Sequence, residues 1–186
     1  MRIISGSHKG RQILAPKNIN IRPTTGKSKE ALFNILNNSF NLEEISVLDL
    51  FSGTGSISYE FASRGVTKIT AVENNHKAIN FIKKKSKELN FPVNVVRKNV
   101  LNYINNDYEK FDFIFLDPPY SFLYGEYKKM IEIISKNKLT ERGMIIVEHS
   151  INLVLDNIKG FLESRKYGSS CLSIFKKKQA YKPDSV

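Results

Sequence analysis

The 186-residue sequence has one cysteine, no tryptophan and no apolar run long enough to cross a membrane. A single cysteine, Cys171, cannot close a disulfide within the chain, which fits a reducing compartment such as the cytoplasm. The three histidines, His8, His76 and His149, do not have the spacing of metal ligands with Cys171. The first ten residues also lack the apolar core of a secretory signal. We therefore expect a cytoplasmic, monomeric protein with no metal and no membrane segment.

Acidic residues are missing from the first 29 positions, although the chain as a whole has 18. This stretch carries seven basic residues: Arg2, Lys9, Arg11, Lys17, Arg22, Lys27 and Lys29. Because the chain also has a net charge of +11, we expect a polyanionic partner, and we assign RNA contact to Arg2, Lys9, Arg11 and Arg22. Two further lysine clusters, one at 83–87 and one at 176–178, fit either nucleic-acid contact or an ordinary solvated face.

Apolar segments alternate in length along the chain and predict alternating strands and helices. After a hairpin over 2–15 and a helix over 28–38 that Ser28 can cap, the expected strands are 47–50, 68–73, 93–97, 111–116 and 144–148. The helices expected among them are 55–63, 77–89 and 127–135. Short, continuously apolar strands are typical of a parallel sheet covered on both faces. Segments 161–166 and 171–176 flank a turn and predict an antiparallel pair at one edge.

Together these segments predict an α/β fold with a doubly wound, mostly parallel seven-stranded sheet. We expect three parts in the chain: a basic N-terminal extension packed on the rest, a catalytic domain and a disordered tail. Their expected bounds are 1–40, 41–178 and 179–186.

A glycine-rich turn follows the first expected strand. In doubly wound sheets, ligands bind beyond the carboxyl ends of the strands, where the strand order reverses. Gly53 and Gly55 let the backbone approach a ligand there. The carboxylate of Asp49 can meet the cationic amino-acid end of S-adenosylmethionine, whereas it would repel the pyrophosphate of a dinucleotide. Since Ser58 also stands where a dinucleotide motif has its third glycine, the turn favours S-adenosylmethionine over NAD.

Polar residues also follow the next two strands. Glu73 ends the second strand, where an acid can accept both hydroxyls of an adenosine ribose, and Asn99 follows the third strand, where it can reach the amino edge of adenine. The expected cofactor site also includes their loop neighbours Phe51, Ser52, Thr54, Asn74 and Val100. The alternative is a plain tight turn beside a solvent-facing acid.

The residues Asp117, Pro118, Pro119 and Tyr120 follow the fourth expected strand. The prolines fix the backbone, so that the Asp117 carboxylate and the Pro118 carbonyl can both accept hydrogens from one amino group. Such acceptors direct the lone pair of an exocyclic base amine, which is otherwise delocalised into the ring, and Tyr120 offers a face on which the base can stack. The motif predicts methylation of such an amine. The alternative is a Pro-Pro turn capped by an Asp.

These motifs resemble those of the bacterial 16S ribosomal RNA guanine-N2 methyltransferase family RsmD. The resemblance covers roughly residues 1–178. It rests on the opening residues 2–6 and 10–11 and on six later positions or segments: 22–25, 30, 32–34, 49–55, 117–120 and 147–148. It implies methylation of one guanine N2 in small-subunit ribosomal RNA, on the RNA or on an assembling subunit. It also implies that Arg22 and Thr25 lie near the methionine end of the cofactor, and Thr25 joins the expected cofactor set.

Two other functions remain open from the sequence. A DNA adenine-N6 methyltransferase can share the Asp-Pro-Pro-Tyr motif, although 186 residues leave little room for a target-recognition region. An RNA-binding module without catalysis, built on the same fold, is the second alternative. The intact motifs argue against it.

Overall fold

The computed structural model describes residues 1–16, 19 and 26–177. Within these residues seven strands form one mostly parallel sheet, which confirms the predicted sheet, and their order is β3-β2-β1-β4-β5-β7-β6. The strands are β1 (Ser46–Leu50), β2 (Lys68–Glu73), β3 (Val93–Arg97), β4 (Phe111–Leu116), β5 (Leu139–Ser150), β6 (Phe161–Tyr167) and β7 (Ser170–Lys176). The helices are α1 (Gly26–Asn37), α2 (Ser56–Ser63), α3 (His76–Glu88), α4 (Val100–Asn106) and α5 (Tyr124–Asn137), with a 3₁₀ turn η1 (Leu42–Glu44).

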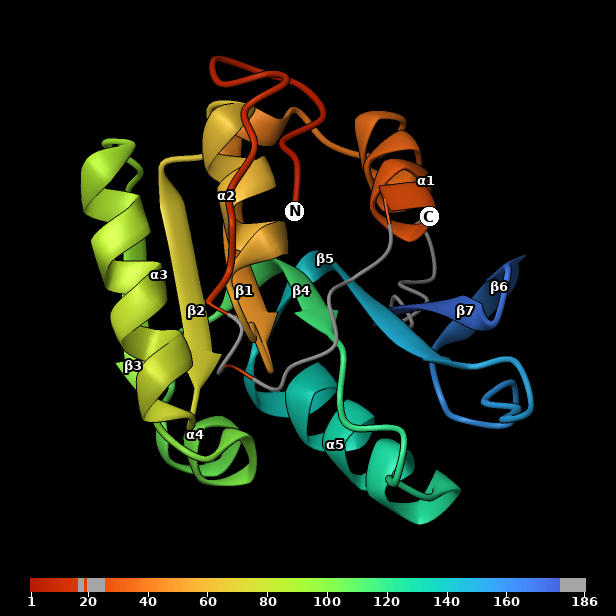
Figure 1. The fold of residues 1–186 in the computed structure, drawn as a ribbon. Helices are drawn as coiled ribbons and strands as arrows, with labels where there is room; N and C mark the ends of the chain where they lie inside the picture. The colour runs from red at the N-terminus through yellow and green to blue at the C-terminus, as the bar shows by residue number, and fades with distance from the viewer. Residues whose placement is uncertain (17–18, 20–25, 178–186) are drawn as a thin grey trace, which may run out of the picture.

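Helices cover both faces of the sheet (Figure 1). Successive residues of a strand point to opposite faces, so Val47 packs in the core that includes α1, α2 and α3, whereas Leu48 packs in the core that includes α4 and α5. Phe113 and Ile114 of β4 divide in the same way. Burial on both faces explains why the central strands are continuously apolar in sequence rather than alternating.

The strand order reverses at β1. The chain runs outward from β1 through β2 to β3, then returns to place β4 on the other side of β1. Both neighbours of β1 are parallel to it, and Leu50 at its end is level with Val72 of β2 and Leu116 of β4. The loops after β1 and β4 therefore leave the same edge of the sheet side by side, and this is where a doubly wound fold binds its ligand.

The last two strands, β6 and β7, form the side of the sheet opposite to β3. β7 pairs antiparallel with β5, and β6 pairs antiparallel with β7, which confirms the expected C-terminal hairpin. The 12-residue β5 is longer than the predicted 144–148. It gains partners at both ends, since Leu139 pairs with Phe111 and Ser150 pairs with Ser170.

Three helices differ from the sequence-based expectation. Helix α1 begins at Gly26, so Ser28 lies inside the first turn and is not its N-cap. Helix α5 begins at Tyr124, before the predicted 127, because Glu126 bonds back to the backbone N–H of Leu123. Helix α4 is one that the sequence did not predict. Its N-cap is Asn99, whose side chain accepts hydrogen bonds from two backbone N–H groups of the first turn.

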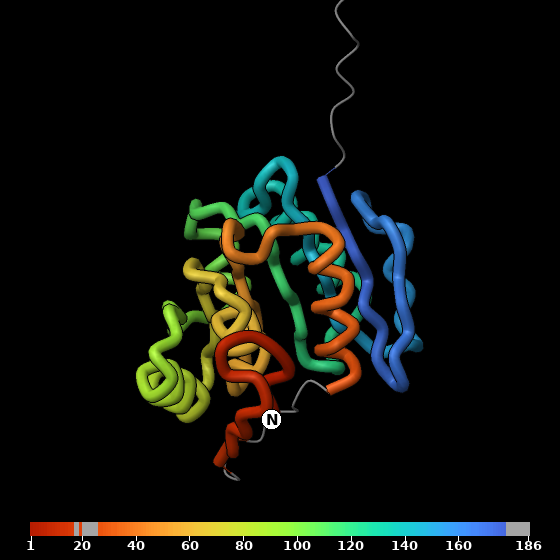
Figure 2. The backbone as a smooth tube through the Cα atoms, turned by 90° about the horizontal axis from the view of Figure 1, so that it is seen from above, coloured from red at the N-terminus to blue at the C-terminus, as the bar shows by residue number. Residues whose placement is uncertain are grey.

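The N-terminal segment lies against α2, away from β6 and β7 (Figure 2). It turns back on itself as expected, but the pairing amounts to one isolated bridge, Arg2 to Gln12, and adds no strand to the sheet. The buried Glu60 of α2 holds the segment by accepting hydrogen bonds from the backbone N–H groups of Ile4 and Ser5, at 2.8 and 3.0 Å.

Lys29, one of the N-terminal basic residues that the structure describes, is not on the surface. Lys29 is 3% exposed, donates to the carbonyl oxygen of Arg2 at 2.6 Å and lies 3.2 Å from the Glu60 carboxylate. Burial lowers the pKa of the Lys29 ammonium, while Glu60 acts in the opposite direction. This lysine therefore ties α1, α2 and the N-terminal segment together and is not available to an external polyanion.

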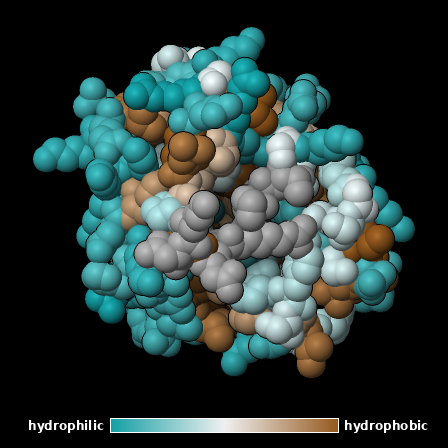
Figure 3. Space-filling view, in the orientation of Figure 1, coloured by the Kyte–Doolittle hydropathy of each residue, from teal (hydrophilic) through white to brown (hydrophobic). Residues whose placement is uncertain are grey.

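The outer face of α3 is hydrophilic (Figure 3, left). Its apolar residues Ala78, Ile79, Phe81 and Ile82 are buried against the sheet, and its lysines point outward. No helix among residues 1–16, 19 and 26–177 is long and apolar enough to span a membrane.

Candidate active site

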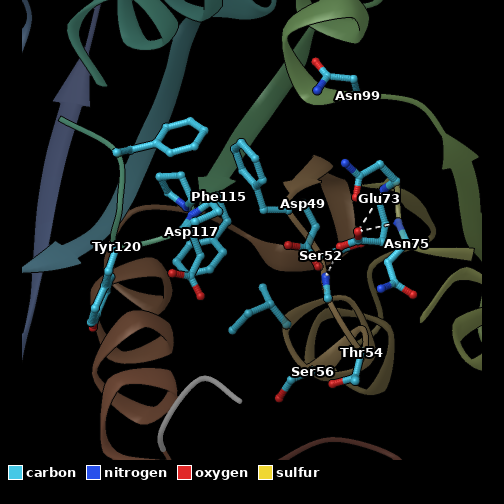
Figure 4. A pocket seen from close by; sticks show the side chains of 17 residues that line it. Asp49, Ser52, Thr54, Ser56, Glu73, Asn75, Asn99, Phe115, Asp117 and Tyr120 are labelled. Carbon is cyan, nitrogen blue, oxygen red and sulfur yellow. Dashed lines mark hydrogen bonds between the residues drawn. The ribbon is translucent and has the colours of Figure 1, made fainter. Parts of the chain in front are cut away.

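A cavity of about 650 Å³ opens at the edge of the sheet where the strand order reverses. This volume lies within the range of about 300–1,000 Å³ that small-molecule sites occupy. The loops after β1, β2, β3 and β4 all contribute to its walls (Figure 4). Its lining residues are Asp49, Phe51, Ser52, Gly53, Thr54, Ser56, Ile57, Glu73, Asn74, Asn75, Asn99, Phe115, Asp117, Pro118, Pro119, Tyr120 and Phe122.

Asp49 lies at the base of this cavity and is only 2% exposed. One of its carboxylate oxygens accepts hydrogen bonds from the hydroxyl and backbone N–H of Ser58, at 2.6 and 3.2 Å. Burial is the main reason that the pKa of Asp49 rises from 3.8 to about 7, and the nearby Glu73 carboxylate adds to the rise. A cationic group placed in the cavity would favour the ionised carboxylate.

Glu73, at the end of β2, organises the loops around it. One carboxylate oxygen accepts from the backbone N–H of Gly53 at 2.9 Å, and the other accepts from Asn74 and Asn75, each at 2.8 Å. The oxygen that accepts from Gly53 retains capacity for a further donor, whereas the other already accepts two hydrogen bonds. Glu73 therefore fixes the glycine-rich turn against β2 while its carboxylate lines the cavity, a structural role that the sequence did not predict.

The glycine-rich turn needs left-handed backbone. Gly55 has a φ of 82° and precedes α2, and a Cβ added there would lie 2.9 Å from the Tyr59 ring. Phe51 has a φ of 58°, an uncommon conformation for a non-glycine residue, and such residues cluster at functional sites.

Within the described part of the chain, the buried hydroxyl of Ser56 lines the cavity and has no hydrogen-bond partner. A polar atom in this position needs a donor or acceptor that a ligand can supply.

The residues after β4 form the wall opposite Glu73. Figure 4 shows Asp117 and Tyr120 on one side of the cavity and Asp49 and Glu73 on the other. Asp117 is half-buried, and its backbone N–H lies 3.5 Å from the Leu50 carbonyl, which places it beside the end of β1. The glycine turn and the Asp-Pro-Pro-Tyr motif therefore share one cavity.

Two aromatic residues, Tyr120 and Phe122, complete this wall. The Tyr120 hydroxyl lies 3.2 Å from the hydroxyl of Ser170, at the start of β7, and 44% of Tyr120 is exposed. Phe122 packs edge-on against Phe51, with ring centroids 5.8 Å apart, so an aromatic pair bridges the loops after β4 and β1. The sequence did not indicate Phe122, Phe115, Ser56, Ile57 or Asn75 as part of the site, although each lies within two residues of a predicted one.

The other predicted site residues fall into three groups. Gly55 is the N-cap of α2 and Val100 is the first residue of α4, and neither lines the cavity. Arg22 and Thr25 lie outside the described residues, as does the predicted tail over 179–186. Arg2, Lys9 and Arg11 are exposed, but the turn that carries Lys9 contacts Ser63 at the far end of α2, while the cavity is at the start of that helix.

The three histidines do not line this cavity. His149 is buried in β5, with its Nε2 2.7 Å from the Ser173 hydroxyl of β7. In the portion that the structure describes, no group of three or more His, Cys, Asp or Glu side chains is arranged to hold a metal ion.

Comparison with known proteins places the chain in a family. A family model described as "Conserved hypothetical protein 95" matches residues 1–176. YlbH of Bacillus subtilis (strain 168), provisionally named an rRNA methyltransferase, is 34% identical over 187 aligned positions. The alignment covers 96% of this chain and 100% of that protein. Ribosomal RNA small subunit methyltransferase D of Buchnera aphidicola subsp. Baizongia pistaciae (strain Bp) is 34% identical over 155 residues, covering 82% of this chain and 78% of that protein.

The fold has close counterparts among solved structures. A hypothetical protein of Thermus thermophilus, TTHA0928, superposes with a TM-score of 0.82 at 23% identity, covering 95% of this chain and 99% of that one. The agreement extends over nearly the whole length of both proteins. The chain therefore belongs to the Conserved hypothetical protein 95 family, that of the ribosomal RNA small subunit methyltransferases D (RsmD), as its sequence motifs indicated.

Proposed function

We propose that this protein is an S-adenosylmethionine-dependent methyltransferase that methylates the exocyclic N2 of a guanine in small-subunit (16S) ribosomal RNA. One observation carries the proposal: the acids at the ends of β1 and β2 and the Asp-Pro-Pro-Tyr residues after β4 line the same cavity. A donor molecule and an acceptor amine can therefore meet there, and alignment of two reactants can be worth about 7–11 kcal/mol of the barrier.

The residues of the cavity suit S-adenosylmethionine, which supplies an electrophilic methyl group when bound. We assign its ammonium to the buried Asp49 carboxylate and a ribose hydroxyl to Glu73, whose oxygen bonded to Gly53 retains one acceptor site. The Ser56 hydroxyl, which has no hydrogen-bond partner among the described residues, lies at the positive end of α2 and suits the carboxylate of the cofactor's methionine part. Because Asn99 uses its side-chain oxygen to cap α4, we assign its amide N–H to a ring nitrogen on the adenine edge.

The acceptor half of the cavity suits a flat base with an amino group. The Asp117 carboxylate and the Pro118 carbonyl accept the two amine hydrogens and direct the nitrogen lone pair toward the methyl donor. As the new N–C bond forms and the bond between sulfur and the methyl group breaks, positive charge moves from the sulfur to the nitrogen. Asp117 stabilises this charge until a proton leaves. Tyr120 provides the stacking face, and a base must be unpaired or flipped out of a helix to reach it.

The choice of substrate follows from the family and the charge. A relative that is 34% identical is a ribosomal RNA small subunit methyltransferase. The net charge of +11 suits a polyanion, and we name ribosomal RNA or the assembling small subunit as the partner. With such a substrate, we expect the protein to act in the cytoplasm. Guanine N2, rather than another exocyclic amine, is the finer assignment that the experiment must test.

Mass spectrometry of nucleosides tests this proposal directly. Small-subunit particles and RNA from cells that lack the protein are incubated with the purified protein and S-adenosylmethionine, then digested. We expect N2-methylguanosine with the wild type and none with Asp117→Ala, which should still bind S-adenosylmethionine in calorimetry. Asp156→Ala, which removes an exposed acid outside the cavity, is the control. N6-methyladenine, or no methylated nucleoside at all, would contradict the proposal.

A further inference from the structure

The turn over residues 6–11, which carries Lys9 and Arg11, and the cavity lie at opposite ends of α3. This turn bonds to Ser63 at the end of α2, and the ring of His8 lies 4.7 Å from that of Phe91, just after the end of α3. Arg11 is close enough to Glu88, the last residue of α3, for the two charges to interact. The turn therefore sits at the C-terminal end of α3, away from the cavity.

The other end of α3 reaches the cavity. Its N-cap, Asn75, is one of the cavity residues and accepts hydrogen bonds from the first turn of the helix. With 13 residues at 1.5 Å each, α3 spans about 20 Å between the cavity and the N-terminal segment. Arg97 and Lys98, exposed at the end of β3, lie next in the chain to Asn99 of the cavity. Basic residues thus occur at both ends of the helix.

The exposed face between these ends carries one sign of charge. Helix α3 has five lysines and one acid, Glu88, which pairs with Lys85 at 2.6 Å. Lys83, Lys84 and Lys87 are exposed on the outer face. On the other side of the sheet, α5 has three lysines but two acids, Glu126 and Glu132, so its face is nearly balanced. Because α5 has the same lysine-rich background but an almost balanced charge, composition alone does not explain the excess positive charge of α3.

From this arrangement we infer that the outer face of α3 is an RNA-binding surface that guides the phosphate backbone from the N-terminal segment to the cavity. The inference rests on the proposed function, since it takes RNA as the substrate. Lysine ammonium groups bind phosphates as point charges and read no sequence, so this face orients the substrate while the cavity selects the base. A span of about 20 Å corresponds to several nucleotides, so a target base in the cavity would leave its flanking backbone over α3.

The test compares two triple variants of the full-length protein. Lys83→Gln, Lys84→Gln and Lys87→Gln together remove charge from α3. Lys128→Gln, Lys129→Gln and Lys136→Gln remove the same charge from exposed positions of α5. Lysine and glutamine have similar helix propensities, so both variants should fold and should bind S-adenosylmethionine as the wild type does. Binding to a ribosomal RNA fragment containing the methylated guanine, and its methylation, are measured from 50 to 200 mM salt.

We expect the α3 variant to bind this RNA on the order of 10-fold more weakly and to lose about 2 from the slope of log affinity against log salt, since each phosphate contact to a single strand contributes about 0.7. The α5 variant should keep the wild-type slope. A wild-type slope in the α3 variant, or an equal loss in both variants, overturns the α3 surface even if methylation is normal. A wild-type protein that neither binds nor methylates the RNA overturns the proposed function itself.

Discussion

Substitution of Asp49 by asparagine should stabilise the protein and weaken its binding of S-adenosylmethionine. Asparagine keeps the size of the side chain and an oxygen that can accept from Ser58, so the packing at this 2%-exposed position is preserved. It removes the charge that burial opposes. The stability of the ligand-free protein and the affinity for the ligand should therefore change in opposite directions, which is typical of a group kept for function at a cost in stability.

The magnitude follows from the pKa of Asp49. Burial raises it from 3.8 to about 7, so the unfolded chain ionises at lower pH than the folded protein does. The stability of the wild type therefore falls between about pH 4 and pH 7 and is constant above. The raised pKa of Asp49 lowers the free energy of unfolding by about 4 kcal/mol at pH 8. At pH 5, where the folded carboxyl is still protonated, it lowers it by about 2 kcal/mol. The asparagine variant should exceed the wild type by up to these amounts.

Urea unfolding at pH 5 and pH 8, without ligand, measures this difference. A variant that is less stable than the wild type at pH 8, or whose advantage does not shrink at pH 5, would contradict a stability cost for the Asp49 charge. Asp156→Asn, at an exposed acid, is the control and should show neither effect. In calorimetry, Asp49→Asn should bind S-adenosylmethionine at least about 10-fold more weakly, since a hydrogen bond to a charged group is worth about 1.5–3 kcal/mol. The wild-type affinity itself should fall below about pH 7, as the carboxylate becomes protonated.

Three further substitutions probe the rest of the site and the N-terminal segment. Glu73→Ala should reduce the affinity for S-adenosylmethionine on the order of 100-fold, because it removes the ribose contacts and releases Gly53; an unchanged calorimetric affinity would exclude the ribose role. Tyr120→Leu should raise the KM for RNA, because about 1–3 kcal/mol of stacking free energy is lost, whereas Tyr120→Phe should change the KM little. Equal effects of the two substitutions would argue against stacking. Neutralising Arg2, Lys9 and Arg11 together should weaken RNA binding and flatten its salt dependence, and unaltered filter binding across salt concentrations would remove these residues from the interface.

The central strands could be predicted from local sequence because they are buried on both faces. The predicted strands 68–73, 93–97 and 111–116 have the bounds that the structure shows. The first and last are short, mostly apolar runs between polar segments, and 93–97, at the edge of the sheet, is marked by its three valines, a residue type enriched in strands. Helix α4 could not be distinguished from a loop by its pattern, since only Val100, Tyr103 and Ile104 are buried in its seven residues. The signal that could have indicated it is Asn99, which both caps the helix and precedes the i, i+3, i+4 pattern.

Residues whose role depends on a distant partner could not be predicted. Lys29 reads as one more positive charge in an acid-free segment, and only the fold brings it to Glu60 in the interior. Phe122 reads as an ordinary apolar residue after a turn, and its place in the site depends on the loop folding back to Phe51. Sequence motifs identify residues whose chemistry is local to a strand end. They do not identify contacts that form when two loops meet.

The two acids at the ends of β1 and β4 illustrate how one cavity can serve two substrates. Asp49 is almost fully buried and bonded to Ser58, a setting that disfavours its charge until a cation arrives. Asp117 is half-buried on the opposite wall, where Pro118 and Tyr120 flank it and solvent can receive a proton. Because the strand order reverses at β1, the ends of these two adjacent strands lie side by side while each acid keeps its own environment. The reversal therefore does more than open a crevice: it brings a buried carboxylate and a half-buried one to the walls of one cavity, and under the proposed function the first would hold the methyl donor and the second the base.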